Sequence, residues 1–246
     1  MKKGLPSFFT SLGLIAGCIS IVISASYGNL TLAGYFILIA AFFDFIDGFT
    51  ARLVNNISEF GKQLDSLADV VSFGVAPSMI LYRLLLLSYV KSSPGANFDV
   101  VNPDFPEVMF MYSAFIVAVF SALRLAKFNL DPAQQKSFKG LAVPANALFI
   151  AGLGFAAEKI IPASTLILTR GFLLSVILIS SFLLVSNIAM FSLKFSSYGF
   201  RENSFRYLFL LISAVLLGIF RLPGLSFVVV VYVLMSLINN WAGKKE

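Results

Sequence analysis

Four aspartates interrupt two strongly apolar segments in the first third of the chain. They are Asp44, Asp47, Asp65 and Asp69. The first pair is spaced i, i+3 and the second i, i+4, so each pair lies on one face of a predicted helix. An ionisable side chain within a membrane costs roughly 2.5 to 3.5 kcal/mol on insertion scales, so each aspartate is a functional candidate. If the chain reverses near Ile57, the two pairs meet at matched depths.

Facing carboxylates repel one another, and the chain has no histidine that could act as a base or a metal ligand. The only cation predicted at this depth is Arg52, which cannot neutralise four acids. Sites made of oxygen ligands suit Mg²⁺, Mn²⁺ or Ca²⁺, and two ions that share carboxylates are typical of phosphoryl transfer. Gly48 and Gly61 leave room for a bulky ligand beside the acids, although helix packing explains either glycine nearly as well. The residues therefore predict a site for two divalent cations.

The elements that position these acids must be membrane helices. The chain has 246 residues, of which 59% are hydrophobic and 12% charged, against about 25% charged in soluble domains. Its mean hydropathy is +0.91, which excludes a water-soluble monomer. We predict an all-α, polytopic helical bundle that forms one integral membrane domain over residues 1–246. The net charge of +6 is assigned to membrane topology and anionic lipid, so no nucleic-acid partner is expected.

About eight transmembrane helices can be placed. Their ranges are Phe8 to Ser26, Thr31 to Val54, Leu64 to Val90, Val108 to Phe128, Leu141 to Ala157, Leu166 to Asn187, Tyr207 to Ile219 and Leu225 to Asn239. An even number of spans puts both termini on one side of the membrane. Most of the 18 lysines and arginines fall on that side; the exceptions are Arg83, Lys91, Lys159, Arg170 and Arg221. The positive-inside rule then predicts that the termini and the acids are cytoplasmic, in an inner (cytoplasmic) membrane.

The acidic segment resembles the signature of the CDP-alcohol phosphatidyltransferases. The family pattern D-x-x-D-G-x-x-A-R-x(8)-G-x(3)-D-x(3)-D fits residues 44–69 at all eight fixed positions. Residues 63–77, 123–129 and 138–145 are similar to the branch that makes phosphatidylserine. The resemblance covers about Pro6 to Pro144, so a catalytic core near 6–145 is expected, with further membrane helices over about 165–240.

The resemblance implies transfer of the phosphatidyl group from CDP-diacylglycerol to the hydroxyl of L-serine, with release of CMP, within a lipid membrane. Two Mg²⁺ or Mn²⁺ ions would be held by the four aspartates, and Asp69 would also take the proton of the acceptor. The nucleotide pocket would be lined by Gly48, Ala51, Arg52 and Gly61, and the acceptor would be bound by Arg124, Asn129 and Lys139. Related enzymes tend to be homodimers. The family often has Pro-Asn and then Thr near its amino terminus, where this chain has Pro6-Ser7 and Thr10.

Other interpretations remain open from the acids alone. An intramembrane prenyltransferase also binds Mg²⁺-diphosphate, but a second acidic cluster is expected there. An ion-coupled transporter predicts acids near the middle of the bilayer and broken helices in related halves. A scaffold would satisfy the acids with Arg52 and neighbouring hydroxyls. Within the family, glycerol 3-phosphate, inositol or inositol phosphate could replace serine, and Arg124 or Lys139 could simply anchor helix ends to lipid headgroups.

Overall fold

The structure is a computed structural model that describes residues 5–53, 58–92, 104–130, 139–192 and 199–241. In this part of the chain the regular structure is helical, apart from one isolated bridge between Lys139 and Ala189. The elements are α1 (Leu5–Val22), η2 (Ile23–Tyr27), α2 (Leu30–Leu53), α3 (Glu59–Asp69), η3 (Val70–Val75), α4 (Ala76–Ser92), α5 (Phe105–Tyr112), η5 (Ser113–Phe115), α6 (Ile116–Leu130), α7 (Val143–Lys159), α8 (Ile161–Ile167), α9 (Arg170–Val185), α10 (Phe200–Phe220) and α11 (Gly224–Trp241).

The helices confirm a polytopic integral membrane protein. Among the described residues, 6 helical segments are long and apolar enough to cross a membrane. The two remaining predicted spans correspond to α7, of 17 residues, and α9, of 16 residues. All eight predicted segments are therefore helical, but the count of eight crossings holds only approximately, because α7 and α9 are shorter than a usual spanning helix.

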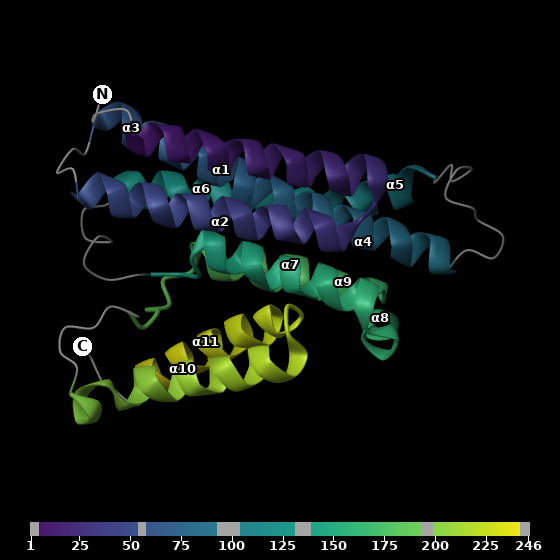
Figure 1. The fold of residues 1–246 in the computed structure, drawn as a ribbon. Helices are drawn as coiled ribbons and strands as arrows, with labels where there is room; N and C mark the ends of the chain where they lie inside the picture. The colour runs from purple at the N-terminus through teal and green to yellow at the C-terminus, as the bar shows by residue number, and fades with distance from the viewer. Residues whose placement is uncertain (1–4, 54–57, 93–103, 131–138, 193–198, 242–246) are drawn as a thin grey trace.

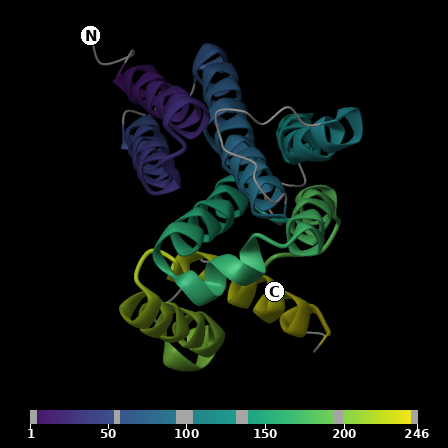
Figure 2. The same cartoon turned by 90° about the vertical axis from the view of Figure 1, so that its right-hand side faces the viewer.

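The helices run roughly alongside one another (Figure 1). The start of α1, the start of α3 and the end of α11 lie on the same side of the bundle, as expected for an even number of crossings. Viewed along the bundle, α4 stands between the α1–α2 pair and α6 (Figure 2). The segment η3 contacts both α1 and α6, while α7 packs against α2, α4 and α11. The α10–α11 hairpin thus joins the rest of the bundle through α7.

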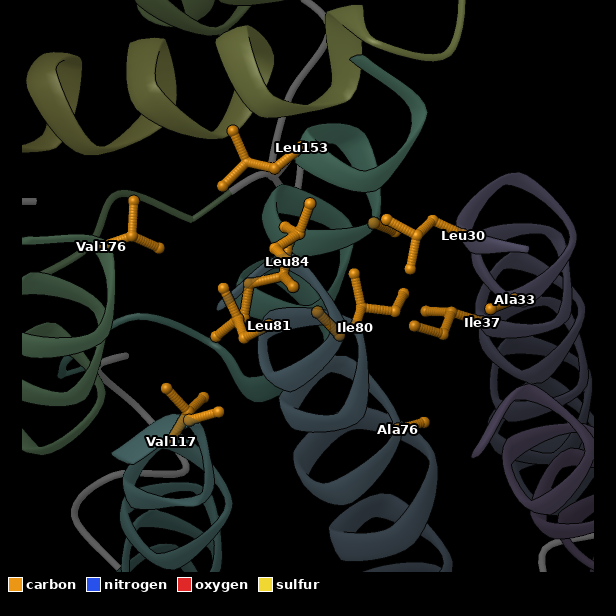
Figure 3. Close-up of a cluster of buried hydrophobic side chains, with 14 of the residues drawn as sticks. Leu30, Ala33, Ile37, Ala76, Ile80, Leu81, Leu84, Val117, Leu153 and Val176 are labelled. Carbon is orange, nitrogen blue, oxygen red and sulfur yellow. The ribbon is translucent and has the colours of Figure 1, made fainter. Parts of the chain in front are cut away.

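A buried apolar core fixes α2, the helix that carries the first two acids, against α4 (Figure 3). Leu30 and Ile37 of α2 and Ile80 and Leu84 of α4 are completely buried in it. Lipid is as apolar as these side chains, so close packing rather than removal from water holds such helices together. The core therefore sets the position of α2 relative to the segment that carries Asp69.

The end of α2 opposite the acids is held by a carboxylate from a distant helix. Glu158, in the last turn of α7, accepts hydrogen bonds from the backbone N–H groups of Leu30 at 2.5 Å and Thr31 at 2.8 Å. These N–H groups have no partner within their own helix, and a negative charge is favourable at a helix amino terminus. Glu158 therefore fixes the axial position of α2.

The third membrane segment changes from an α-helix to the π-helix η3 directly after Asp69. Here Ser72 donates a hydrogen bond of 3.1 Å to the carbonyl of Gly13 in α1. A Cβ atom on Gly17 would lie 2.5 Å from the Ser72 Oγ and 2.7 Å from its Cα, so only glycine permits this approach. π-Helical turns are frequent at functional sites. This turn places the backbone of α1 beside the acids.

Candidate active site

Three of the four aspartates meet between α2 and α3. Asp44, Asp47 and Asp65 each offer one carboxylate oxygen, and these oxygens lie within 4.8 Å of one another. Asp47 is buried and the other two are half-buried. The i, i+3 and i, i+4 spacings thus place the acids on facing sides of the two helices. The turn predicted near Ile57 lies outside the described residues.

The fourth aspartate, Asp69, lines a pocket together with the other three acids but does not belong to the cluster of carboxylate oxygens that Asp44, Asp47 and Asp65 form. This pocket measures about 190 Å³ including its open mouth and receives Asp69 from the end of α3. Its walls come from α1, α2, α3 and η3, and its lining residues are Thr10, Gly13, Ala40, Asp44, Asp47, Asp65, Ala68, Asp69, Ser72 and Phe73. Asp69 therefore differs from the other three acids in its position, which permits a different role.

The part of the chain that the structure describes provides no ion-pair partner for the acids. The ion pair found there joins Arg170 to Glu107 at 2.7 Å, and none of the four aspartates forms one. The Oδ2 atom of Asp47 is buried and has no hydrogen-bond partner there. An uncompensated carboxylate cluster is costly to bury, so the scaffold interpretation gains no support. A donor set made only of carboxylate oxygens fits hard divalent cations such as Mg²⁺ or Mn²⁺.

A larger cleft opens beside the acid pocket, towards the start of α3. It encloses about 610 Å³, including its open mouth. Its lining residues are Pro6, Ser7, Thr10, Asp47, Gly48, Ala51, Ser58, Gly61, Lys62 and Asp65. Three of the four predicted nucleotide-pocket residues, Gly48, Ala51 and Gly61, are among them. Apart from its own helix backbone, no atom of the described residues lies within 4 Å of the position that a Cβ on Gly48 would occupy, so the wall of the cleft is open there.

The basic residue that lines the cleft is Lys62, and not Arg52 as predicted for the nucleotide pocket. Arg52 is exposed in the last turn of α2 and is not among the residues that line the cleft, whereas Lys62 of α3 is. Lys62 precedes Asp65 by three residues and Asp69 by seven, which is the spacing of one helix face. That signal was available in the sequence, and our sequence analysis missed it. The predicted contact of Arg52 with the nucleotide stays a prediction.

Thr10 of α1 also lines both the acid pocket and the cleft. Thr10 corresponds to the threonine of the family's amino-terminal pattern, but its sequence context alone predicts no role for it. Ser7, Thr10, Gly13 and Gly17 are small residues spaced by three or four positions, a pattern that permits close helix approach in membranes. This stripe would have indicated that α1 forms one wall of the site.

Two of the three predicted acceptor-binding residues lie on the acid side of α6. Arg124 is 8% exposed, and its guanidinium interacts electrostatically with the Asp69 carboxylate. Its Nε atom is buried and has no hydrogen-bond partner among the described residues. Asn129 donates a 2.7 Å hydrogen bond to the hydroxyl of Ser66, which lies between Asp65 and Asp69 in the sequence.

Lys139, the third predicted acceptor residue, lies elsewhere. It is exposed, pairs with Ala189 in a backbone bridge, and lines neither the acid pocket nor the cleft. The neighbouring Gly140 has a φ of 72° and donates its N–H to the carbonyl of Ile188 at 2.8 Å. The structure thus brings Arg124 and Asn129 to the acids and leaves Lys139 against the segment that follows α9. Its role in acceptor binding stays a prediction.

Comparison with known proteins supports the chemistry that this geometry suggests. Residues 3–238 match the family described as CDP-alcohol phosphatidyltransferase, which extends the resemblance well beyond Pro144. Proteins named CDP-diacylglycerol–serine O-phosphatidyltransferase from Helicobacter pylori and Bacillus subtilis are 36% and 33% identical to the chain. The matches cover 59% and 65% of this chain and 54% and 80% of those proteins.

An archaetidylserine synthase from Methanothermobacter thermautotrophicus is 33% identical, over 63% of this chain and 60% of that protein. The chain thus spans about half the length of the Helicobacter relative and most of the Bacillus one. Because the family match covers nearly all of its residues, the chain belongs to the CDP-alcohol phosphatidyltransferase family.

Proposed function

We propose that this protein transfers the phosphatidyl group of CDP-diacylglycerol to the hydroxyl of L-serine, which yields phosphatidylserine and CMP. The observation that carries the proposal is the meeting of Asp44, Asp47 and Asp65 within 4.8 Å, beside a cleft lined by the small residues Gly48, Ala51 and Gly61. Serine as the acceptor is supported by the names of the similar proteins. The cleft would receive the nucleotide part of the donor.

The four aspartates would hold two divalent cations, Mg²⁺ or Mn²⁺. Asp44, Asp47 and Asp65 would supply the closest ligands, and Asp69 would complete the second site. When bound, such ions neutralise the charge of a diphosphate and of the departing nucleotide. The buried Oδ2 of Asp47, which has no hydrogen-bond partner in the described part of the chain, supports this assignment, because a buried acceptor atom without a partner is costly.

The residues around Asp69 support a direct transfer. The serine oxygen would attack the phosphorus that carries the lipid, and the bond from this phosphorus to the CMP oxygen would break. A serine hydroxyl is a poor nucleophile at neutral pH, so a carboxylate must take its proton as the new bond forms. Asp69 would act as this base. Arg124, which interacts with Asp69 and is buried beside it, would bind the serine carboxylate, with Asn129 close by and Lys139 as the third acceptor-binding residue of this proposal.

The proposal also includes the orientation of the protein. The cleft is lined by residues from the start of α1, the end of α2 and the start of α3, and these helix ends lie on the same side of the bundle as the end of α11 (Figure 1). Most lysines and arginines are assigned to this end, so we place it on the cytoplasmic side of the inner membrane. Serine and the released CMP, both water-soluble, would then exchange directly with the cytoplasm. A homodimer, which the family resemblance implies, is tested by chemical crosslinking of the protein in membranes.

One reconstitution tests the proposed function. Purified protein in mixed micelles is given CDP-diacylglycerol, Mg²⁺ or Mn²⁺, and one of several alcohols, and both CMP and the lipid product are measured. We expect CMP release that depends on serine and stops in chelator. Release with glycerol 3-phosphate or inositol instead would keep the chemistry and change the acceptor. No release with any alcohol would contradict the enzyme assignment and favour an ion-coupled transporter.

A further inference from the structure

We propose that the Lys62 ammonium, rather than the Arg52 guanidinium, binds the diphosphate of the nucleotide donor. This inference rests on the proposed function, because it assigns a ligand contact within the same cleft. Lys62 is half-buried in the first turns of α3 and lines the cleft together with Gly61 and Ser58. Among the described residues that line the cleft, it is the one cation.

The Lys62 ammonium is available for a ligand. Glu59 and Asp65 stand three residues before and after it, a spacing that often allows ion pairs on a helix. Lys62 nevertheless forms no ion pair within the described ranges. A cation near a helix amino terminus is also unfavourable, because the helix dipole is positive there. Both observations are explained if an anion in the cleft is its partner.

The charge of the site points to the same partner. Two divalent ions balance the four aspartates and leave no net positive charge for the donor. A nucleotide-linked diphosphate brings two further negative charges into a cleft in which Lys62 is the one cation among the described lining residues. An additional cation is therefore required close to the phosphates, and hydrogen bonds to charged groups contribute about 1.5 to 3 kcal/mol each.

Arg52 cannot fill this role from its observed position. It is eight residues after Asp44, and eight helical steps rotate a side chain about 80° away from the starting face. The arginine is accordingly exposed at the end of α2 and does not line the cleft. In contrast, Lys62 shares its helix face with Asp65 and Asp69. The two basic residues thus provide a matched pair for an experiment.

The test measures nucleotide binding without turnover. Wild-type protein and the variants Lys62→Met, Lys62→Arg and Arg52→Met are titrated with CDP and with CMP by calorimetry in detergent micelles with Mg²⁺. We expect Lys62→Met to weaken CDP binding about tenfold or more, with a smaller effect on CMP. Lys62→Arg should restore much of the CDP affinity, and Arg52→Met should lose much less CDP affinity than Lys62→Met and should lower the affinities for CDP and CMP to the same extent.

Thermal unfolding of the ligand-free variants separates binding from folding. Because Lys62 opposes the dipole of α3, Lys62→Met should unfold at the wild-type temperature or slightly above it. Wild-type affinity for CDP in Lys62→Met, or an equal loss in Arg52→Met, would overturn the inference while the proposed function stands. If wild-type protein binds neither CDP nor CMP, the proposed function fails together with the inference.

Discussion

Replacing Gly48 with alanine separates the two possible roles of this glycine, helix packing and ligand access. Beyond the backbone of its own helix, a Cβ atom at Gly48 would have no neighbour within 4 Å among the residues that the structure describes, so the methyl group is accommodated there without strain. Alanine also favours a helix interior over glycine by roughly 0.5 to 1 kcal/mol. We therefore expect Gly48→Ala to unfold at the wild-type temperature or above it.

The same methyl group would project into the cleft, where we place the nucleotide. Inserting a methyl group into a tightly filled space typically costs about 1 to 3 kcal/mol. At about 1.4 kcal/mol per factor of ten, this predicts a KM for CDP-diacylglycerol raised by roughly 5- to 150-fold. The KM for serine should change little, because the acceptor is expected on the α6 side of Asp69.

Gly218→Ala provides a matched control for this variant. Gly218 lies in the last turn of α10, and a Cβ there would meet no atom of the described residues within 4 Å apart from its own helix backbone. Its alanine variant should be no less stable than the wild type and should keep the wild-type kinetics. The measurement is CMP release against donor concentration in mixed micelles, paired with thermal unfolding. A wild-type donor KM in Gly48→Ala would refute the placement of the nucleotide in this cleft.

Three further substitutions test other parts of the site. Asp69→Asn should slow a single turnover by roughly 10²- to 10⁴-fold and retain CDP binding; a near-normal rate would remove Asp69 as the base. Arg124→Ala should raise the KM for serine about tenfold or more without changing the donor KM, and an unaltered serine KM would remove this arginine from the acceptor site. Gly17→Ala should lower the unfolding temperature, at a cost of about 1 to 3 kcal/mol, because its Cβ would lie 2.7 Å from the Ser72 Cα. The corresponding change at Gly13, whose Cβ would have its nearest neighbours at 3.5 Å, is the control and should be nearly neutral.

The sequence predicted the helices that carry the acids because two physical signals coincide there. Apolar length indicated the membrane segments, and the spacing of Asp44, Asp47, Asp65 and Asp69 indicated which faces meet. The change to a π-helix after Asp69 was not predictable in this way. Residues 70–75 are apolar and compatible with an ordinary helix, and their conformation depends on close contacts with α1 and α6.

For the basic residues, too, the sequence indicates the approximate depth in the membrane but not which residue faces the acids. Arg124 lies near the end of one predicted span and Lys139 just before the start of the next, at the same predicted membrane face, so their charge and depth do not distinguish them. The structure does, because Arg124 points into the bundle near Asp69 whereas Lys139 is exposed beside Ala189. Which side of a helix end faces the bundle depends on the neighbouring helices, and a single sequence contains little information about that choice.

Helices α10 and α11 make specific hydrogen bonds that their apolar sequences do not predict. Tyr232 of α11 donates a 3.0 Å hydrogen bond to the carbonyl of Phe191, and Arg206 of α10 donates one of 2.8 Å to the carbonyl of Ser192. Any residue type offers a backbone carbonyl, so no sequence motif marks these acceptors. Tyr232 also interacts electrostatically with Arg124. The α10–α11 hairpin therefore holds the segment after α9 and interacts with Arg124, as expected from a family match that continues to residue 238.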